Sequence, residues 1–119
     1  MKIAVTSQGK DLNSQVDPRF GRAAYVIIVD SDTNDFQVID NSANLNAMKG
    51  AGIQAASNVV NSGADVLLTG HCGPNAFKAL QAGKVAVSND ASGTVIESVK
   101  QYLDGKLPHA AAANVDGHW

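Results

Sequence analysis

The spacing of the apolar positions changes near residue 51. Before this point, β-branched and aromatic residues gather in three short runs, Lys2–Ser7, Arg22–Asp30 and Phe36–Asp40, and such runs are typical of strands. The turn-forming cluster Ser31–Asp35 joins the last two runs. These two strands are therefore predicted to form a hairpin.

The second half alternates between helical periodicity and short apolar runs. Ile53, Ala56 and Val60 recur at the spacing of a helix. Thr94 and Glu97 have the spacing of a capping box, which opens another helix. The elements expected in this half are helix 51–63, strand 65–69, helix 73–83, strand 84–88 and helix 94–105.

This element order predicts an α/β fold. Strands that alternate with helices pair in parallel through right-handed crossovers, whereas the hairpin makes the second strand antiparallel. We expect a ribonuclease H-like motif, with a mixed five-stranded sheet in the order 3-2-1-4-5 and about three helices. A flavodoxin-like sheet is the alternative, but it needs a helix within 8–21, which is polar loop. Residues 1–105 are predicted to form one domain and 106–119 an irregular tail.

The predicted topology brings four loops to one edge of the sheet. These loops follow the parallel strands and comprise 8–21, 41–50, 70–73 and 89–93. The strand order reverses between strands 1 and 4, where open α/β sheets usually form their ligand crevice. The hairpin turn 31–35 is expected at the opposite edge.

Three segments near this crevice carry candidate chemistry: Asp17–Arg22, Met48–Ile53 and Gly70–Phe77. The last two open helices beside glycines, so backbone N–H groups there can approach an anion closely. Arg19, Arg22 and Lys49 add positive charge. Together they predict an anion site, although glycines and prolines also punctuate ordinary turns and scattered cations are usually solvated.

In order and content, these segments resemble the signatures of the dinitrogenase iron–molybdenum cofactor biosynthesis family. The run Asp17–Ala24 is most similar to the orange-protein branch of that family, in anaerobic bacteria. The resemblance covers about residues 1–105. It implies a ribonuclease H-like fold and non-covalent binding of an anionic metal–sulfide cluster. For the orange-protein branch that cluster is a mixed molybdenum–copper sulfide, and a cluster of the iron–molybdenum type is the alternative.

A sulfide cluster is a bulky, polarisable anion that brings its own ligands. We expect Arg19, Arg22 and Lys49 to neutralise its charge, the two helix starts to donate N–H groups, and Met48 to make a soft contact. Asp17 is expected to organise its own loop. The full set of expected binding residues is Arg19, Phe20, Gly21, Arg22, Met48, Lys49, Gly50, Ala51, Gly52, Ile53, His71, Cys72, Gly73, Pro74 and Asn75.

Cys72 and His71 are also the candidate metal ligands. A cysteine at a helix N-terminus has a lowered pKa, and its thiolate suits copper. Cys is equally common as a small buried residue, and His71 could be structural. Ile53 and Phe77 could form an apolar wall of the site, but both sit at helical core spacing.

Composition narrows the function further. The chain has 119 residues, 45% hydrophobic and 17% charged, with a net charge of −2, so no overall basic field attracts nucleic acid or anionic membranes. Its single cysteine excludes an internal disulfide framework or a cysteine-cage zinc site. The N-terminus lacks a signal-peptide core. We expect a soluble, cytoplasmic monomer whose partners are cluster donor or acceptor proteins.

Three other function classes remain as alternatives. A ribonuclease H-type nuclease needs carboxylates on its central strands, and the first strand has none. A cysteine hydrolase needs a histidine base for Cys72, and the adjacent His71 is poorly placed. A phosphate or nucleotide binder would suit the glycines, but no P-loop is present. The sequence therefore predicts a binding and carrier protein without enzymatic activity.

Overall fold

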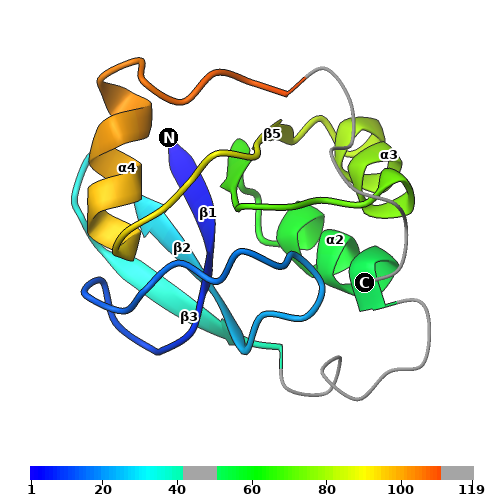
Figure 1. Ribbon diagram of the computed structural model, residues 1–119, viewed down its shortest axis with the longest axis horizontal. Coiled ribbons are helices and arrows are strands. Elements are labelled where there is room, and N and C mark those ends of the chain that lie inside the picture. The colour runs from blue at the N-terminus through cyan, green and yellow to red at the C-terminus, as the bar shows by residue number, and fades with distance from the viewer. Residues whose placement is uncertain (42–50, 111–119) are drawn as a thin grey trace.

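The computed structural model describes residues 1–41 and 51–110, with the side chain of Ala51 excepted. Its strands and helices follow the predicted order (Figure 1). The strands are β1 (Lys2–Ser7), β2 (Tyr25–Asp30), β3 (Phe36–Asp40), β4 (Val66–Leu68) and β5 (Ala86–Ser88), and the helices are α2 (Ala51–Asn61), α3 (Pro74–Ala82) and α4 (Val95–Leu103).

The five strands form one mixed sheet in the order β3-β2-β1-β4-β5. β2 is antiparallel to both β1 and β3, whereas β1, β4 and β5 are mutually parallel. The predicted α/β class, strand order and antiparallel second strand are thus confirmed. The carboxyl ends of β1, β4 and β5 consequently meet at one edge of the sheet, hereafter the carboxyl edge.

Helices cover both faces of this sheet (Figure 1). Because side chains alternate along a strand, Ala4 and Leu67 join the core beneath α2 and α3. Their neighbours Ile3 and Val66 join the core beneath α4. No helix in the described ranges has the length and hydrophobicity of a membrane span.

Three details differ from the sequence prediction. The buried side of α2 is formed by Ala55, Ala56 and Val59, so Ile53, expected at core spacing, is 50% exposed. The strand predicted at 84–88 begins only at Ala86, because Lys84 has a positive φ of 63° and cannot continue an extended backbone. The strand predicted at 65–69 is likewise limited to β4.

The segment after α4 packs against the domain. Leu107 is buried in the core beneath α4, and the Ala110 N–H donates to the Val87 carbonyl of β5 at 2.6 Å. The Tyr102 hydroxyl and His109 Nε2 lie 2.8 Å apart. Burial raises the pKa of the Tyr102 hydroxyl, and the negative charge of Asp65 raises it further. Residues 106–110 therefore cross the outer side of β5.

Candidate functional site

The loops at the carboxyl edge are joined by backbone pairing. Ser7 pairs with Val16, which holds the loop after β1 against the end of its own strand. Arg19 pairs in parallel with His71, which follows β4. The Ser31–Asp35 turn lies at the other end of the sheet, where the Met1 amine contacts Ser31 Oγ at 3.2 Å. The turn and the site loops thus lie at opposite edges of the sheet, as predicted.

The contact between Pro18 and Gly70 fixes the spacing of these loops. The His71 N–H donates to the Pro18 carbonyl at 2.6 Å, and the Phe20 N–H donates to the His71 carbonyl at 3.0 Å. A Cβ on Gly70 would lie 2.8 Å from Pro18 Cα and 2.9 Å from its carbonyl oxygen. Only glycine allows this approach of the two backbones.

Two buried hydroxyls support the same contact from inside. Thr6, at the end of β1, donates to the Asp17 carbonyl at 2.6 Å, and its Oγ1 lies 2.9 Å from Thr69 Oγ1. Both threonines are fully buried. Neither threonine is among the site residues predicted from the sequence. The available signal was a threonine directly after an apolar run on each of two neighbouring strands.

The predicted role of Asp17 as a loop-organising acid is confirmed. This carboxylate is buried and accepts the Arg19 N–H at 3.0 Å through Oδ1. The same oxygen lies 3.6 Å from Arg19 Nε, whose side chain is 50% exposed. Arg22 follows within one turn, because its N–H donates to the Arg19 carbonyl at 3.2 Å. Both arginines thus belong to the loop that pairs with His71.

The first turn of α3 begins beside His71 and has no side-chain cap. Gly73 is the N-cap residue, and Pro74 occupies the first helical position. The N–H groups of Asn75 and Ala76 therefore have no acceptor within the helix. A Cβ on Gly52 would approach Ala76 Cβ to 3.2 Å, so the first turns of α2 and α3 lie side by side.

The structure contradicts the expected ionisation of Cys72. Its side chain is 0% exposed and belongs to the core beneath α2 and α3. Burial raises the pKa of the Cys72 thiol to about 12 instead of lowering it, because removal from water disfavours the thiolate more than the nearby helix end favours it. A protonated, buried thiol is a poor nucleophile, which argues against a cysteine hydrolase.

The remaining candidates divide into exposed and buried groups. His71, Pro74 and Asn75 are exposed at the edge, as is Ile53 at the start of α2. Phe20 and Phe77 are core residues, 1% and 5% exposed, and Phe20 reaches the edge only through its backbone. Gly21, with a φ of 95°, turns the chain toward β2. Met48, Lys49, Gly50 and the side chain of Ala51 lie outside the described residues.

Asn41 is a second residue that sequence reasoning missed. Its side chain is buried, and Nδ2 donates to the Ala23 carbonyl at 2.8 Å. It thereby holds the segment after the arginines against the end of β3. Within 1–41 and 51–110, no three His, Cys, Asp or Glu side chains are grouped so that they could hold a metal ion.

Fold and site together define an α/β protein with arginines and an uncapped helix start at the carboxyl edge. The dinitrogenase iron-molybdenum cofactor family model matches residues 1–105, and the chain belongs to this family. It is 48% identical to the orange protein of Desulfovibrio gigas, solved in its apo form, with a TM-score of 0.93 and 96% of each chain covered.

Two further relatives agree with this assignment. A NifB-like protein from Thermotoga, solved by NMR, is 33% identical with a TM-score of 0.83, and 98% of each chain is covered. An uncharacterized protein of Methanocaldococcus jannaschii is 29% identical over 110 residues, which cover 90% of this chain and 89% of the relative. The predicted family is therefore confirmed, and membership supports a role in metal–sulfur cluster binding.

Proposed function

We propose that the protein binds and carries an anionic molybdenum–copper sulfide cluster without covalent attachment, in a crevice at the carboxyl edge. The observation that carries this proposal is the backbone pairing of Arg19 with His71. It brings the arginine loop to the uncapped start of α3. Cations and free N–H groups are what an anion with its own sulfide ligands requires.

In this proposal each group has a definite task. Arg19 and Arg22 neutralise the cluster charge, and the N–H groups of Asn75 and Ala76 donate to cluster sulfides. Ile53, exposed beside the α3 start, supplies the apolar wall. Met48 and Lys49 are also predicted to contact the cluster, Met48 through a soft contact and Lys49 through its charge. The cluster is cargo of a cytoplasmic monomer that performs no catalysis and exchanges it with donor or acceptor proteins.

Cys72 is not needed as a metal ligand in this proposal. Its thiol lies in the core, and its Sγ is 3.7 Å from the Gly73 carbonyl oxygen. Coordination to copper would require both ionisation and exposure of this side chain. His71 is the exposed residue of the pair, and in this proposal its side chain donates a hydrogen bond to the cluster.

The test is a titration of the apo protein with tetrathiomolybdate and copper, followed by visible absorbance and by amide chemical shifts. Shifts are expected in 17–22 and 70–77, with none in 31–35. The double variant Arg19→Ala/Arg22→Ala should bind at least about tenfold more weakly, with a loss that shrinks as salt rises. Lys100→Ala/Lys106→Ala, which removes the same charge elsewhere, should bind like wild type.

Two results would contradict the proposal. Normal uptake by the folded arginine variant would refute electrostatic binding at this edge. Equal shifts on addition of inorganic phosphate, with no coloured complex, would favour the phosphate-binding alternative, because the α3 start also suits phosphate.

A further inference from the structure

The outer edge of β3 has no partner strand in the described ranges. β3 pairs with β2 alone, and Asp30 N–H donates to the Asp35 carbonyl at 2.8 Å, so residues 35, 37 and 39 direct their backbone groups toward β2. The backbone N–H and C=O groups of Phe36 and Val38 therefore point away from the sheet. Such an edge can accept an additional strand.

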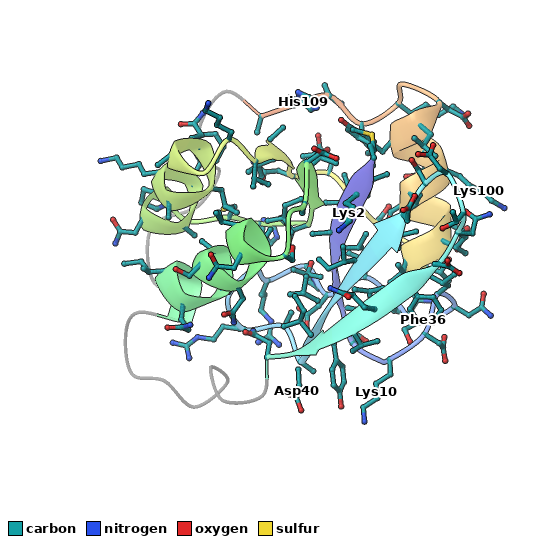
Figure 2. The ribbon with its side chains drawn as sticks, turned by 180° about the vertical axis from the view of Figure 1, so that it is seen from behind. Lys2, Lys10, Phe36, Asp40, Lys100 and His109 are labelled. Atoms are coloured by element: carbon teal, nitrogen blue, oxygen red, sulfur yellow. The ribbon has the colours of Figure 1, made fainter. Side chains whose placement is uncertain are left out.

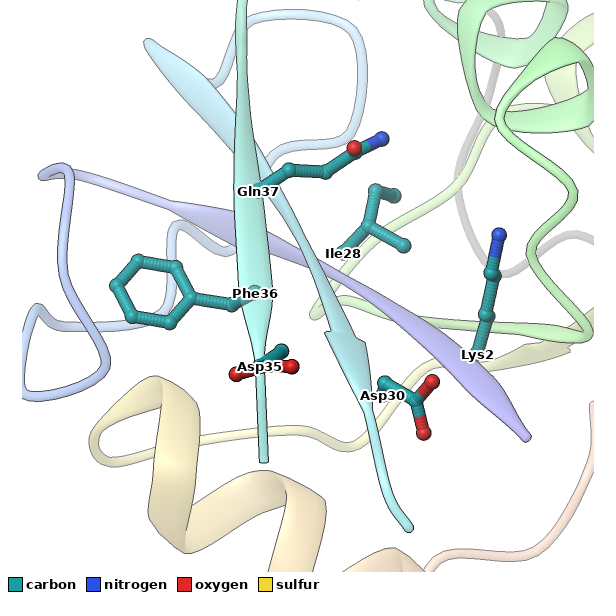
Figure 3. A pocket seen from close by; sticks show the side chains of 6 residues that line it. All are labelled: Lys2, Ile28, Asp30, Asp35, Phe36 and Gln37. Atoms are coloured by element: carbon teal, nitrogen blue, oxygen red, sulfur yellow. The ribbon is translucent and has the colours of Figure 1, made fainter. Parts of the chain in front are cut away.

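The two faces of this edge differ in chemistry. Phe36 and Val38 lie on the α4 side of the sheet and are 43% and 37% exposed. On the opposite side is an open hollow of about 160 Å³. Its lining residues are Lys2, Ile28, Asp30, Asp35, Phe36 and Gln37 (Figure 3). Figure 3 shows Phe36 directed to one side of β3, and Gln37 and Ile28 to the other.

The charge around this edge is predominantly negative, although Lys2 also lines the hollow and offsets part of the charge of Asp30 and Asp35. Residues 23–41 contain four aspartates and no lysine, arginine or histidine. Asp32 pairs with the Met1 amine at 3.5 Å. Within the described part of the chain, neither Asp30 nor Asp35 has an ion-pair partner, although both line the hollow. A second copy of this acidic hairpin would be repelled, whereas a basic segment would be attracted.

We propose that the β3 edge is a docking site for an extended segment of a partner protein in which basic and apolar side chains alternate. As an added strand, the segment would hydrogen-bond to Phe36 and Val38 through its backbone. Its alternate side chains would fall on opposite faces. Apolar side chains would cover Phe36 and Val38, while basic ones would enter the hollow beside Asp30 and Asp35. This site lies on the hairpin away from the carboxyl edge and does not depend on cluster binding.

The probe is a capped six-residue peptide of alternating valine and arginine, added to the ¹⁵N-labelled full chain. We expect shifts concentrated in residues 35–39 and slower hydrogen exchange at the Phe36 and Val38 amides. A peptide with three valines followed by three arginines has the same charge and composition but cannot match both faces. It should bind at least about fivefold more weakly.

Two variants separate backbone pairing from charge. Val38→Pro removes an N–H that points away from β2, so the internal ladder stays intact and docking should be lost. Asp30→Asn/Asp35→Asn should weaken binding about five- to tenfold, in a salt-dependent manner. The matched control Asp90→Asn/Asp104→Asn, which removes two exposed acids elsewhere, should bind like wild type.

The proposal fails if the alternating peptide causes no shifts in 35–39 at about 5 mM. It also fails if both peptides bind equally, or if folded Val38→Pro binds normally. Should Val38→Pro not fold, the aspartate variant decides, because Asn at position 30 retains the oxygen that accepts the Asp32 N–H at 2.9 Å. Equal binding by the aspartate variant and its control would then refute the docking site.

Discussion

Substitution of Gly70 tests whether the contact between the two edge loops governs cluster binding. In Gly70→Ala, the new methyl would meet three Pro18 atoms at 2.8 to 2.9 Å. Carbon atoms in contact need about 3.5 Å, so the loops must separate by roughly 0.7 Å. The backbone cannot relax freely, because two hydrogen bonds of 2.6 and 3.0 Å cross this contact.

The expected cost is that of overpacking, about 1–3 kcal/mol of unfolding free energy. Denaturant unfolding followed by circular dichroism measures it. Cluster affinity should fall about tenfold, because Arg19 and His71 no longer keep their spacing. The titration with tetrathiomolybdate and copper measures that loss.

The control for this prediction is Gly105→Ala. Gly105 has a φ of 78° with open space around its Cβ position, so alanine costs about 1–2 kcal/mol through backbone strain alone. It lies after α4, away from the carboxyl edge. Equal cluster affinities for Gly70→Ala and Gly105→Ala would refute the reasoning, as would wild-type stability of Gly70→Ala.

Two further predictions concern buried groups of the site. The raised pKa of Cys72 stabilises the fold below about pH 9, and this contribution is lost as pH rises toward about 12. Above pH 9, the free energy of unfolding of wild type should therefore fall by about 1.4 kcal/mol per pH unit more than that of Cys72→Ala, as measured by denaturant unfolding. If the unfolding free energies of the two proteins change with pH in parallel, the thiol is not buried. Thr6→Val should cost about 1–3 kcal/mol, because the Asp17 carbonyl and the Thr69 hydroxyl lose their partner. It should also weaken cluster binding in the titration with tetrathiomolybdate and copper, whereas an unchanged affinity would limit Thr6 to a structural role.

The sheet was predictable because each strand carries its own local signal. The β2–β3 hairpin follows from two apolar runs around a polar turn, and α4 from its capping box, in which Thr94 Oγ1 accepts the Glu97 N–H at 3.2 Å. In return, the Thr94 N–H donates to Glu97 Oε1 at 3.1 Å, and this hydrogen bond lowers the pKa of the Glu97 carboxyl. These features involve residues close in sequence, so reading the chain in order reveals them.

The site was predictable only as a set of segments. Nothing local shows that Gly70 touches Pro18, because the two lie 52 positions apart in the sequence. The burial of Cys72 depends on how α2 and α3 cover the sheet, which decides between a solvated and an enclosed thiol. Ile53 is exposed because the buried side of α2 centres on Ala55 and Val59, a rotation that the sequence period alone does not fix.

The two outer strands of the sheet, β3 and β5, differ in their ability to accept an added strand, and this difference limits how many molecules can join through the sheet. The Val87 carbonyl of β5 already accepts the Ala110 N–H, and β5 has only three residues. β3 has five residues, and its neighbours in the sheet lie on one side only (Figure 2). A sheet that can be extended from one side but is occupied on the other cannot propagate from molecule to molecule. Strand addition to this protein should therefore end in a closed one-to-one pair and never in a filament.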